Sequence, residues 1–502
     1  MLGILLAITY TVLFIFLIWK INFFRDESIS RKIIVFVFLL KIVAGTILWL
    51  VYTRIYPDRL TADIFKYFDD GKVMYNALFS KPLDYFKMLL GIPDASLLHY
   101  YNDDMGHWTR PFNQGMYDEN RTLIRFNALV DIFSFSNYHV HTVFICFLSL
   151  TGLMGIYKSF SSFLSNKKKE LFAAIFLLPS VLFWGSGVLK EGLIVFFLGM
   201  VIYHYQKFIQ EGVSAKRLCL VFIFLFLLSI TKIYILLVLL PALIAHTWVV
   251  KTKNRFSEIK YAVVLIIYFS IGLVIPKYHF PFMLMEKQRQ GIYMAQGGSY
   301  LGNQKLNKFV YIYPNIEKRI IRLKNNPGFC KIVPGIAYTS WNLTTHLDSM
   351  YVHSSSDTST YWIFYDQPAA GSYIKIPLIE PTIPSIIKNA PLAFFNTAFR
   401  PHLLEAKNPL MIFSAIENIF ILLFIFICML FVSRKIQNRN MIYFCFSITV
   451  LLFALIGLTT PILGAVVRYK IPALPFFLIT FLLLLDKEKL LHKFPFLKKF
   501  IG

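Results

Sequence analysis

The chain has 502 residues, of which 57% are hydrophobic, 17% aromatic and only 16% charged, and its mean hydropathy is +0.60. Soluble globular domains carry about 25% charged residues, so this composition excludes a soluble enzyme and a secreted, disordered or collagen-like chain. Lys and Arg total 51 against 27 Asp and Glu, a net charge of +24. In a membrane protein such an excess collects on cytoplasmic loops beside anionic lipid, which makes nucleic acid a poor default partner.

Long apolar runs predict an all-α, polytopic membrane protein. A membrane span needs about 20 mostly apolar residues, and about eleven runs approach that length. They are 2–23, 33–52, 139–160, 170–185, 188–206, 217–231, 233–250, 260–276, 410–433, 440–458 and 472–486. The chain lacks CxxC, HExxH, Walker-type and GxGxxG patterns, which argues against zinc proteases and cytosolic nucleotide enzymes.

Basic residues predict the sidedness of these spans. In an eleven-span arrangement the Lys and Arg clusters that flank the runs all fall on one side, which the positive-inside rule makes cytoplasmic. The N-terminus is then outside and the C-terminus inside. The expected organisation is N-terminal spans (1–52), a first outer loop (53–138), a central bundle (139–276), a large outer loop (277–409) and C-terminal spans with a basic tail (410–502).

The first outer loop opens with three carboxylates in an acid-poor chain: Asp63, Asp69 and Asp70. On a helix Asp63, Tyr67 and Asp70 share one face and apolar residues the other. This pattern predicts an interfacial helix with its apolar face on the membrane and its carboxylates at the outer surface. A solvated polar face with a helix cap is the alternative for each single Asp.

Two tight outer turns carry further charged residues. Pro179–Glu191 contains small residues for the turn and ends in Lys190 and Glu191, which form either a local ion pair or part of a cavity lip. Thr231–Tyr234 contains Lys232, a lone lysine that either snorkels to the interface or, with Lys190, joins Arg468 and Tyr469 as a candidate for binding the donor phosphate.

The end of the large outer loop contains Arg400, His402 and Glu405, and the following span contains the pair Glu417–Asn418. We favour a structural pairing of Arg400 with Glu405 that holds the loop to the bundle. His402 is more often a packed histidine than a ligand. All three stay secondary candidates for the site.

A late segment places basic residues outside, against the general bias. Arg468 and Tyr469 directly precede Lys470 and the last span. A guanidinium beside a tyrosine suits a phosphate at the bilayer surface, because guanidinium binds phosphate bidentately.

Carboxylates and cations are therefore expected together on one membrane face, without an ATP-binding element. Group transfer from a polyprenyl-phosphate sugar needs such groups: a carboxylate base for the acceptor hydroxyl and cations for the departing phosphate. A divalent metal could share the second task, but the sequence does not specify a metal site.

The layout resembles the GT-C superfamily of integral-membrane glycosyltransferases. The shared features are an acidic motif in the first outer loop, a multi-span bundle and a late R-Y-x-x-P-x-x-P-like segment, here Arg468–Pro475. The P-S-x-x-F-W…K-E stretch at Pro179–Glu191 also resembles bacterial members linked to surface polysaccharides.

The resemblance implies a GT-C-like bundle with interfacial helices, a polyprenyl-linked donor, and a glycan, lipid or protein acceptor. It also implies a bacterial inner membrane with the active site facing the periplasm. The span 2–23 is additional to the usual pattern, which leaves the choice among Asp63, Asp69 and Asp70 open. A lone Glu191 beside Lys190 leaves metal dependence open.

Three other functions compete with this one. An O-antigen polymerase or ligase would act on a lipid-linked oligosaccharide and rely on outer Arg and His rather than an acidic first-loop motif. A lipid-linked sugar flippase would carry charges deep in several spans and some internal symmetry. A non-catalytic envelope scaffold would use the same residues for partner binding only.

Overall fold

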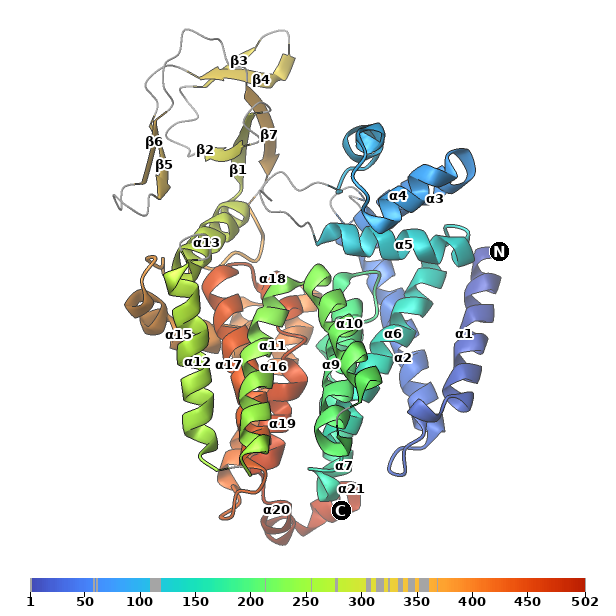
Figure 1. Cartoon of the computed structure of the whole chain (residues 1–502), viewed down its shortest axis with the longest axis vertical. Helices are drawn as coiled ribbons and strands as arrows, with labels where there is room; N and C mark the ends of the chain where they lie inside the picture. The colour runs from blue at the N-terminus through green and yellow to red at the C-terminus, as the bar shows by residue number, and fades with distance from the viewer. Residues whose placement is uncertain are drawn as a thin grey trace.

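The computed structural model describes residues 2–56, 59, 62–108, 119–212, 214–253, 255–275, 279–303, 308–312, 320–323, 326–332, 337–341, 348–351, 361–367 and 369–501. Most of them form helices that run between two ends of one bundle (Figure 1). The long helices are α1 (Leu2–Lys20), α2 (Arg31–Arg54), α6 (Tyr138–Phe160), α9 (Lys190–Glu211), α10 (Ala215–Thr231), α11 (Ile233–Lys251), α12 (Ser257–Val274), α13 (Phe280–Gln296), α15 (Ile383–Phe399), α16 (Pro409–Leu430) and α17 (Arg439–Thr459).

Within the described residues, eight helices are long and apolar enough to cross a membrane: α1, α2, α6, α9, α11, α12, α16 and α17. A ninth span forms if α18 (Leu463–Tyr469) and α19 (Leu474–Leu484), which meet at 63°, count as one. The multi-pass helical membrane architecture is therefore confirmed for this part of the chain. The predicted count of eleven spans is not.

Three of the predicted runs account for the difference. The run 170–185 is broken before Pro179 into α7 (Lys168–Phe176) and α8 (Pro179–Trp184), because proline lacks the N–H that would continue the helix. The run 217–231 is α10, with 17 residues. The run 472–486 is α19, with 11 residues.

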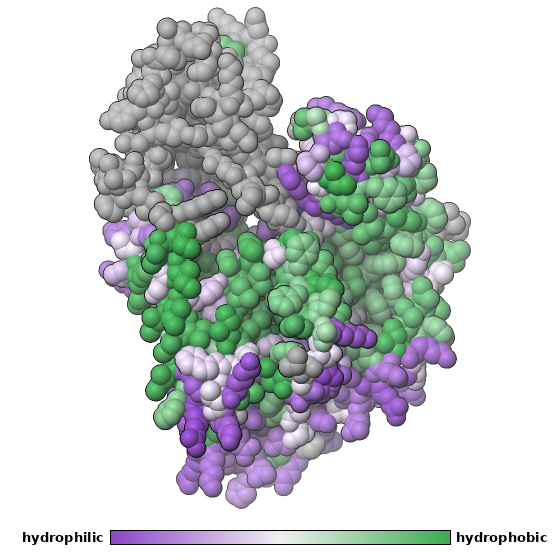
Figure 2. Space-filling view, in the orientation of Figure 1, coloured by the Kyte–Doolittle hydropathy of each residue, from purple (hydrophilic) through white to green (hydrophobic). Residues whose placement is uncertain are grey.

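The bundle has an apolar belt and one strongly hydrophilic end, at the bottom of Figure 2. The C-terminal helices α20 (Lys487–Lys493) and α21 (Lys498–Ile501) lie at that end, and the N-terminus lies at the opposite one (Figure 1). Lys487 pairs there with Glu170 at 3.0 Å. Termini at opposite ends agree with an odd number of crossings.

The helices of the predicted first outer loop lie at the end opposite the C-terminus (Figure 1). They are α3 (Asp63–Ser80), α4 (Pro82–Leu90) and α5 (Asn120–Ser134). The expectation that the apolar face of α3 rests on lipid is wrong, because Phe65 and Phe68 pack on Tyr138 with ring centroids 5.5 and 5.4 Å apart. Tyr67 and Asp70 on the other face are also buried. Protein covers α3 on both faces.

Strands follow α13, a feature that the expectation of an all-α chain did not include. Strands β1 (Gly298–Asn303), β2 (Lys308–Ile312), β3 (Ile320–Leu323), β4 (Asn326–Ile332) and β7 (Tyr361–Gln367) form an antiparallel sheet in the order β2-β1-β7-β4-β3. Strands β5 (Ala337–Trp341) and β6 (Asp348–Tyr351) form a separate antiparallel pair.

Helices α6 and α9 cross at a pair of glycines. A Cβ atom on Gly199 would lie 2.0 Å from the Gly152 carbonyl oxygen, and one on Gly152 would lie 2.2 Å from the Val195 carbonyl oxygen. Small residues allow membrane helices to approach this closely, and the approach gains van der Waals contact along both helices. Because α9 begins with Lys190 and Glu191, this crossing also determines where those two residues lie.

We predict that Gly199→Ala lowers the free energy of unfolding by about 1–3 kcal/mol, because the added methyl group overpacks the crossing. Thermal unfolding of the purified protein in detergent measures the change. Gly371→Ala is the matched control, since a Cβ there meets nothing within 4 Å. Equal melting temperatures for Gly199→Ala and the wild type would contradict the prediction.

Candidate active site

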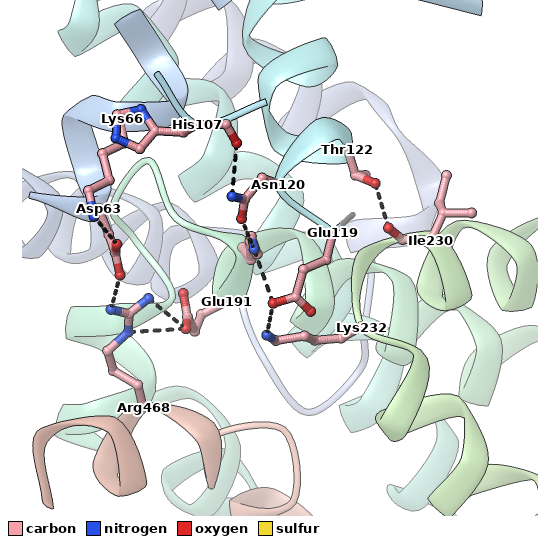
Figure 3. Close-up of polar contacts among 11 residues, drawn as sticks. Asp63, Lys66, His107, Glu119, Asn120, Thr122, Glu191, Ile230, Lys232 and Arg468 are labelled. Atoms are coloured by element: carbon pink, nitrogen blue, oxygen red, sulfur yellow. Dashed lines mark hydrogen bonds and ion pairs between the residues drawn. The ribbon is translucent and has the colours of Figure 1, made fainter. Parts of the chain in front are cut away.

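Residues from three distant segments meet in one ion-pair cluster, drawn in Figure 3. Arg468 Nη1 lies 2.8 Å from Asp63 Oδ2, and Arg468 Nη2 lies 3.0 Å from Glu191 Oε1. Arg468 Nε also donates to Glu191 Oε1, at 3.1 Å. We call Asp63, Glu191 and Arg468 the guanidinium cluster. The structure thus brings together three of the residues that the sequence singled out.

Helix ends explain why these three residues converge. Asp63 and Glu191 both lie in the first turn of a helix, α3 and α9, and Arg468 lies in the last turn of α18. Helix N-termini carry partial positive charge and favour carboxylates, whereas C-termini favour cations. Each charge is therefore stabilised by its own helix as well as by the cluster.

The three members differ in exposure. The side chain of Asp63 is 34% exposed, that of Arg468 is 16% exposed, and that of Glu191 is 4% exposed. Trp184, at the end of α8, places its ring 5.3 Å from the centre of the Arg468 guanidinium. This cation–π contact stabilises the guanidinium while its N–H groups bind the carboxylates.

The Asp63 and Glu191 carboxylates also differ in how completely their oxygens are paired. Burial tends to raise the Asp63 pKa, but the charges of Arg468 and Lys66 and the Arg468 hydrogen bond outweigh it and hold the pKa well below its usual range. Asp63 is therefore a weak base. Glu191 Oε2 is buried and has no hydrogen-bond partner among the described residues. It is the one carboxylate oxygen of this cluster that is left open for another group.

A second cluster lies beside the first (Figure 3). Glu119 Oε1 lies 2.5 Å from Lys232 Nζ and 3.3 Å from Lys190 Nζ. Lys190 Nζ also donates to Asn120 Oδ1, at 2.7 Å. We call Glu119, Lys190 and Lys232 the lysine cluster. Lys190 and Glu191 are adjacent in sequence, so the start of α9 supplies one member to each cluster.

Aromatic rings line the lysine cluster. Lys190 Nζ is 5.0 Å from the ring centre of Tyr67, and Lys232 Nζ is 5.4 and 5.3 Å from those of Tyr234 and Tyr469. These contacts stabilise two ammonium groups that share one carboxylate. Tyr469, predicted as a phosphate-binding partner of Arg468, lies instead against Lys232.

Glu119 is held by the start of α5. Thr122 Oγ1 donates to the Ile230 carbonyl oxygen at 2.5 Å, and Asn120 Nδ2 donates to the His107 carbonyl oxygen at 3.0 Å. The first bond brings α5 to the end of α10, next to Lys232, and the second ties α5 to His107. Glu119 and Asn120 were not predicted as site residues, because no local spacing connects them with the other charged residues of the two clusters.

The other two first-loop acids have different partners. Asp69 pairs with Arg59, at 2.6 Å between Oδ1 and Nη2, and both side chains are exposed. Asp70 is buried and accepts the backbone N–H groups of Gly106 and His107 at 3.2 and 2.8 Å. Within the described residues neither contacts Arg468. Of the three first-loop acids left open by the sequence, the structure brings only Asp63 to the guanidinium cluster.

Arg400, His402 and Glu405 form a separate group between α15 and α16. Arg400 binds Glu405 through two hydrogen bonds, and His402 Nε2 lies 3.3 Å from Glu405 Oε2. Burial raises the Glu405 pKa, but the bonds from Arg400 and His402 outweigh it, so the net shift is downward. The geometry is that of a structural pair, and no contact among the described residues joins it to the guanidinium cluster.

The donor set does not fit a metal ion. In the part of the chain that the structure describes, no three His, Cys, Asp or Glu side chains gather closely enough to bind one. Arg468 lies between Asp63 and Glu191, where a cation would have to sit.

No family model, curated protein or solved structure matches this chain. The chemistry is therefore argued from the geometry of the two clusters.

We predict that Arg468→Met lowers the free energy of unfolding by about 3 kcal/mol at neutral pH, because removing one partner leaves the buried Glu191 carboxylate unpaired. We take the lower end of the usual range because Asp63 is one-third exposed and screened by water. Arg59→Met, which breaks an exposed pair, should cost at most about 1 kcal/mol.

The same variant has a predictable pH dependence. A carboxylate whose folded-state pKa is depressed contributes stability above its unfolded pKa of about 3.9, and that stability is lost as the pH falls toward the folded value. The difference between wild type and Arg468→Met should therefore narrow as the pH falls from about 5 through about 3 and below. Chemical denaturation at several pH values measures it, and a pH-independent difference would contradict the assignment.

Proposed function

We propose that the protein is a membrane glycosyltransferase that moves a sugar from a polyprenyl-phosphate-linked donor to an acceptor hydroxyl. The observation that carries the proposal is the adjacency of a cluster that supplies a buried carboxylate and a cluster that supplies two ammonium groups. In the guanidinium cluster two carboxylates bind one guanidinium, with Lys66 Nζ 3.6 Å from Asp63 Oδ1 at its edge, and in the lysine cluster two ammonium groups share Glu119.

We place the phosphate at Lys190 and Lys232 rather than at Arg468. The Arg468 guanidinium already binds two carboxylates, so a phosphate there would have to displace one of them. The two ammonium groups share Glu119 and are nearly buried, which strengthens their interaction with a phosphate. This placement revises the role that the sequence suggested for Arg468 and Tyr469.

We assign the base to Glu191. Its free Oε2 takes the proton of the acceptor hydroxyl, and the acceptor oxygen forms a bond to the anomeric carbon of the donor sugar. The bond between that carbon and the phosphate oxygen breaks, and the electron pair leaves with the polyprenyl phosphate. Negative charge thus passes from the guanidinium cluster to the lysine cluster, while the total charge of the site stays constant.

We further propose an orientation in a bacterial inner membrane, with the two clusters facing the periplasm and the basic end in the cytoplasm. The support is the positive-inside rule together with the separation of the clusters from the end that carries α20, α21 and Lys167. The products would then be cell-surface glycans, and a GT-C-like arrangement would be reached with a bent α18–α19 pair as the last span.

We predict that Glu191→Gln lowers the turnover of purified protein by about 10²–10⁴-fold, the usual contribution of a general base. Asp63→Asn should lower it less, and Asp69→Asn should match the wild type. Mass spectrometry of glycosylated acceptor and released polyprenyl phosphate, with a panel of polyprenyl-phosphate hexoses, measures transfer. Wild-type turnover in Glu191→Gln would sink the base assignment. A flippase would leave the mass of the lipid unchanged.

Lys232→Met is predicted to raise the KM for the polyprenyl-phosphate donor by about tenfold or more, because a hydrogen bond to a charged group is worth a factor of that order. Lys87→Met is the control. Lys87, in α4, pairs with Asp94 at 2.5 Å, and this pair lies outside both clusters. If Arg468→Lys raised the donor KM more than Lys232→Met, the phosphate would belong at Arg468.

A further inference from the structure

The six-residue helix α8 leads directly into the site, yet it is bounded by breaks on both sides. Leu177 and Leu178 separate it from α7, and the turn 185–189 separates it from α9. The ends of a helix leave backbone N–H and C=O groups without partners inside the helix. At membrane depth such groups must be satisfied by protein, because lipid offers no hydrogen bonds.

A buried carboxylate holds the first end of α8. Glu417, in the apolar span α16, accepts the Ser180 N–H on Oε2 and the Ser180 hydroxyl on Oε1, both at 2.6 Å. Glu417 is only 5% exposed. A carboxylate at a helix N-terminus is favoured by the helix dipole as well as by the two hydrogen bonds.

A buried ammonium holds the other end. Lys41, in the apolar span α2, is fully buried and donates from Nζ to the Gly185 carbonyl oxygen at 3.1 Å, immediately after α8 ends. Gly45, one turn further along α2, allows the turn to approach, because a Cβ there would lie 2.6 Å from the Ser186 carbonyl oxygen. The charge at each end of α8 thus has the sign that the dipole favours.

Both sides of the guanidinium cluster depend on this arrangement. Trp184 is the last residue of α8, and its ring makes a cation–π contact with Arg468. The turn after α8 leads to Glu191 at the start of α9. Asn418, the neighbour of Glu417, accepts a hydrogen bond from Lys470 Nζ at 2.8 Å, two residues after Arg468. The adjacent residues Glu417 and Asn418 of α16 therefore contact both the segment that leads to Glu191 and the segment that carries Arg468.

We propose that Lys41 and Glu417 are positioning residues that clamp α8 at its two ends and so set the positions of Glu191 and Arg468. The clamp stands on geometry alone. Its effect on turnover rests on the proposed function, so the test has one arm for each.

Hydrogen–deuterium exchange of the full-length protein in detergent tests the clamp without any activity. In Lys41→Met and in Glu417→Gln, amides within 179–191 should exchange about tenfold faster or more, since each variant removes a hydrogen bond to a charged group. Lys167→Met is the matched control, because buried Lys167 donates to the Leu482 and Leu485 carbonyl oxygens at the end of α19. It should change exchange near 482–490 and leave 179–191 unchanged.

Kinetics tests the positioning role. Lys41→Met should lower kcat roughly 100-fold, the effect of about 1 Å of misplacement, with the donor KM nearly unchanged, and Lys41→Arg should restore most of it. Ser180→Ala, which removes one of the two bonds to Glu417, gives a milder loss if the other variants do not fold. Unchanged exchange in 179–191 overturns the clamp. Faster exchange with wild-type kcat overturns the positioning role. Absent transfer in the wild type contradicts only the proposed function.

Discussion

Charge buried at membrane depth needs a partner of opposite charge or a helix end, and the fold depends on this requirement. Lys41 and Lys167 place their ammonium groups on the C-terminal carbonyls of α8 and α19. Glu417 caps the start of α8, and Lys470 donates to the Ala398 carbonyl oxygen in the last turn of α15 as well as to Asn418. Because an unpaired buried charge is strongly destabilising, each contact ties together segments that the sequence separates. The broken and bent helices, α7–α8 and α18–α19, are the segments held in this way.

The same principle brings the site together. Two helices present their first turns and a third presents its last turn, so two carboxylates and one guanidinium meet with favourable helix dipoles. Glu191 keeps one carboxylate oxygen without a hydrogen-bond partner among the described residues, and the lysine cluster beside it places two ammonium groups on Glu119. A site of this kind can separate a proton from a developing phosphate charge without changing its total charge, which is the requirement of glycosyl transfer from a lipid phosphate.

Sequence patterns anticipated much of this arrangement, because its members were charges out of place in an apolar chain. Glu191 and Arg468 could be singled out since each ends or begins an apolar run. Asp63 could not be separated from Asp69 and Asp70, because the difference lies in which partner each meets in space. Glu119 carries no local signal, and its role depends on bonds from α5 to α10 and to residues 106–108.

Helix breaks were harder to predict than helices. The runs 170–185 and 472–486 are apolar enough for a span, yet Pro179 divides the first, and the second is a short helix bent against α18. The strands in 298–367 were missed altogether.

The most direct test of the account is a structure of the protein with polyprenyl phosphate, the proposed leaving group, bound in a lipid nanodisc. The account predicts its phosphate within hydrogen-bonding distance of Lys190 Nζ and Lys232 Nζ, with Arg468 still bound to Asp63 and Glu191. A phosphate bound at the basic end of the bundle, or at Arg468 with the two carboxylates displaced, would contradict it.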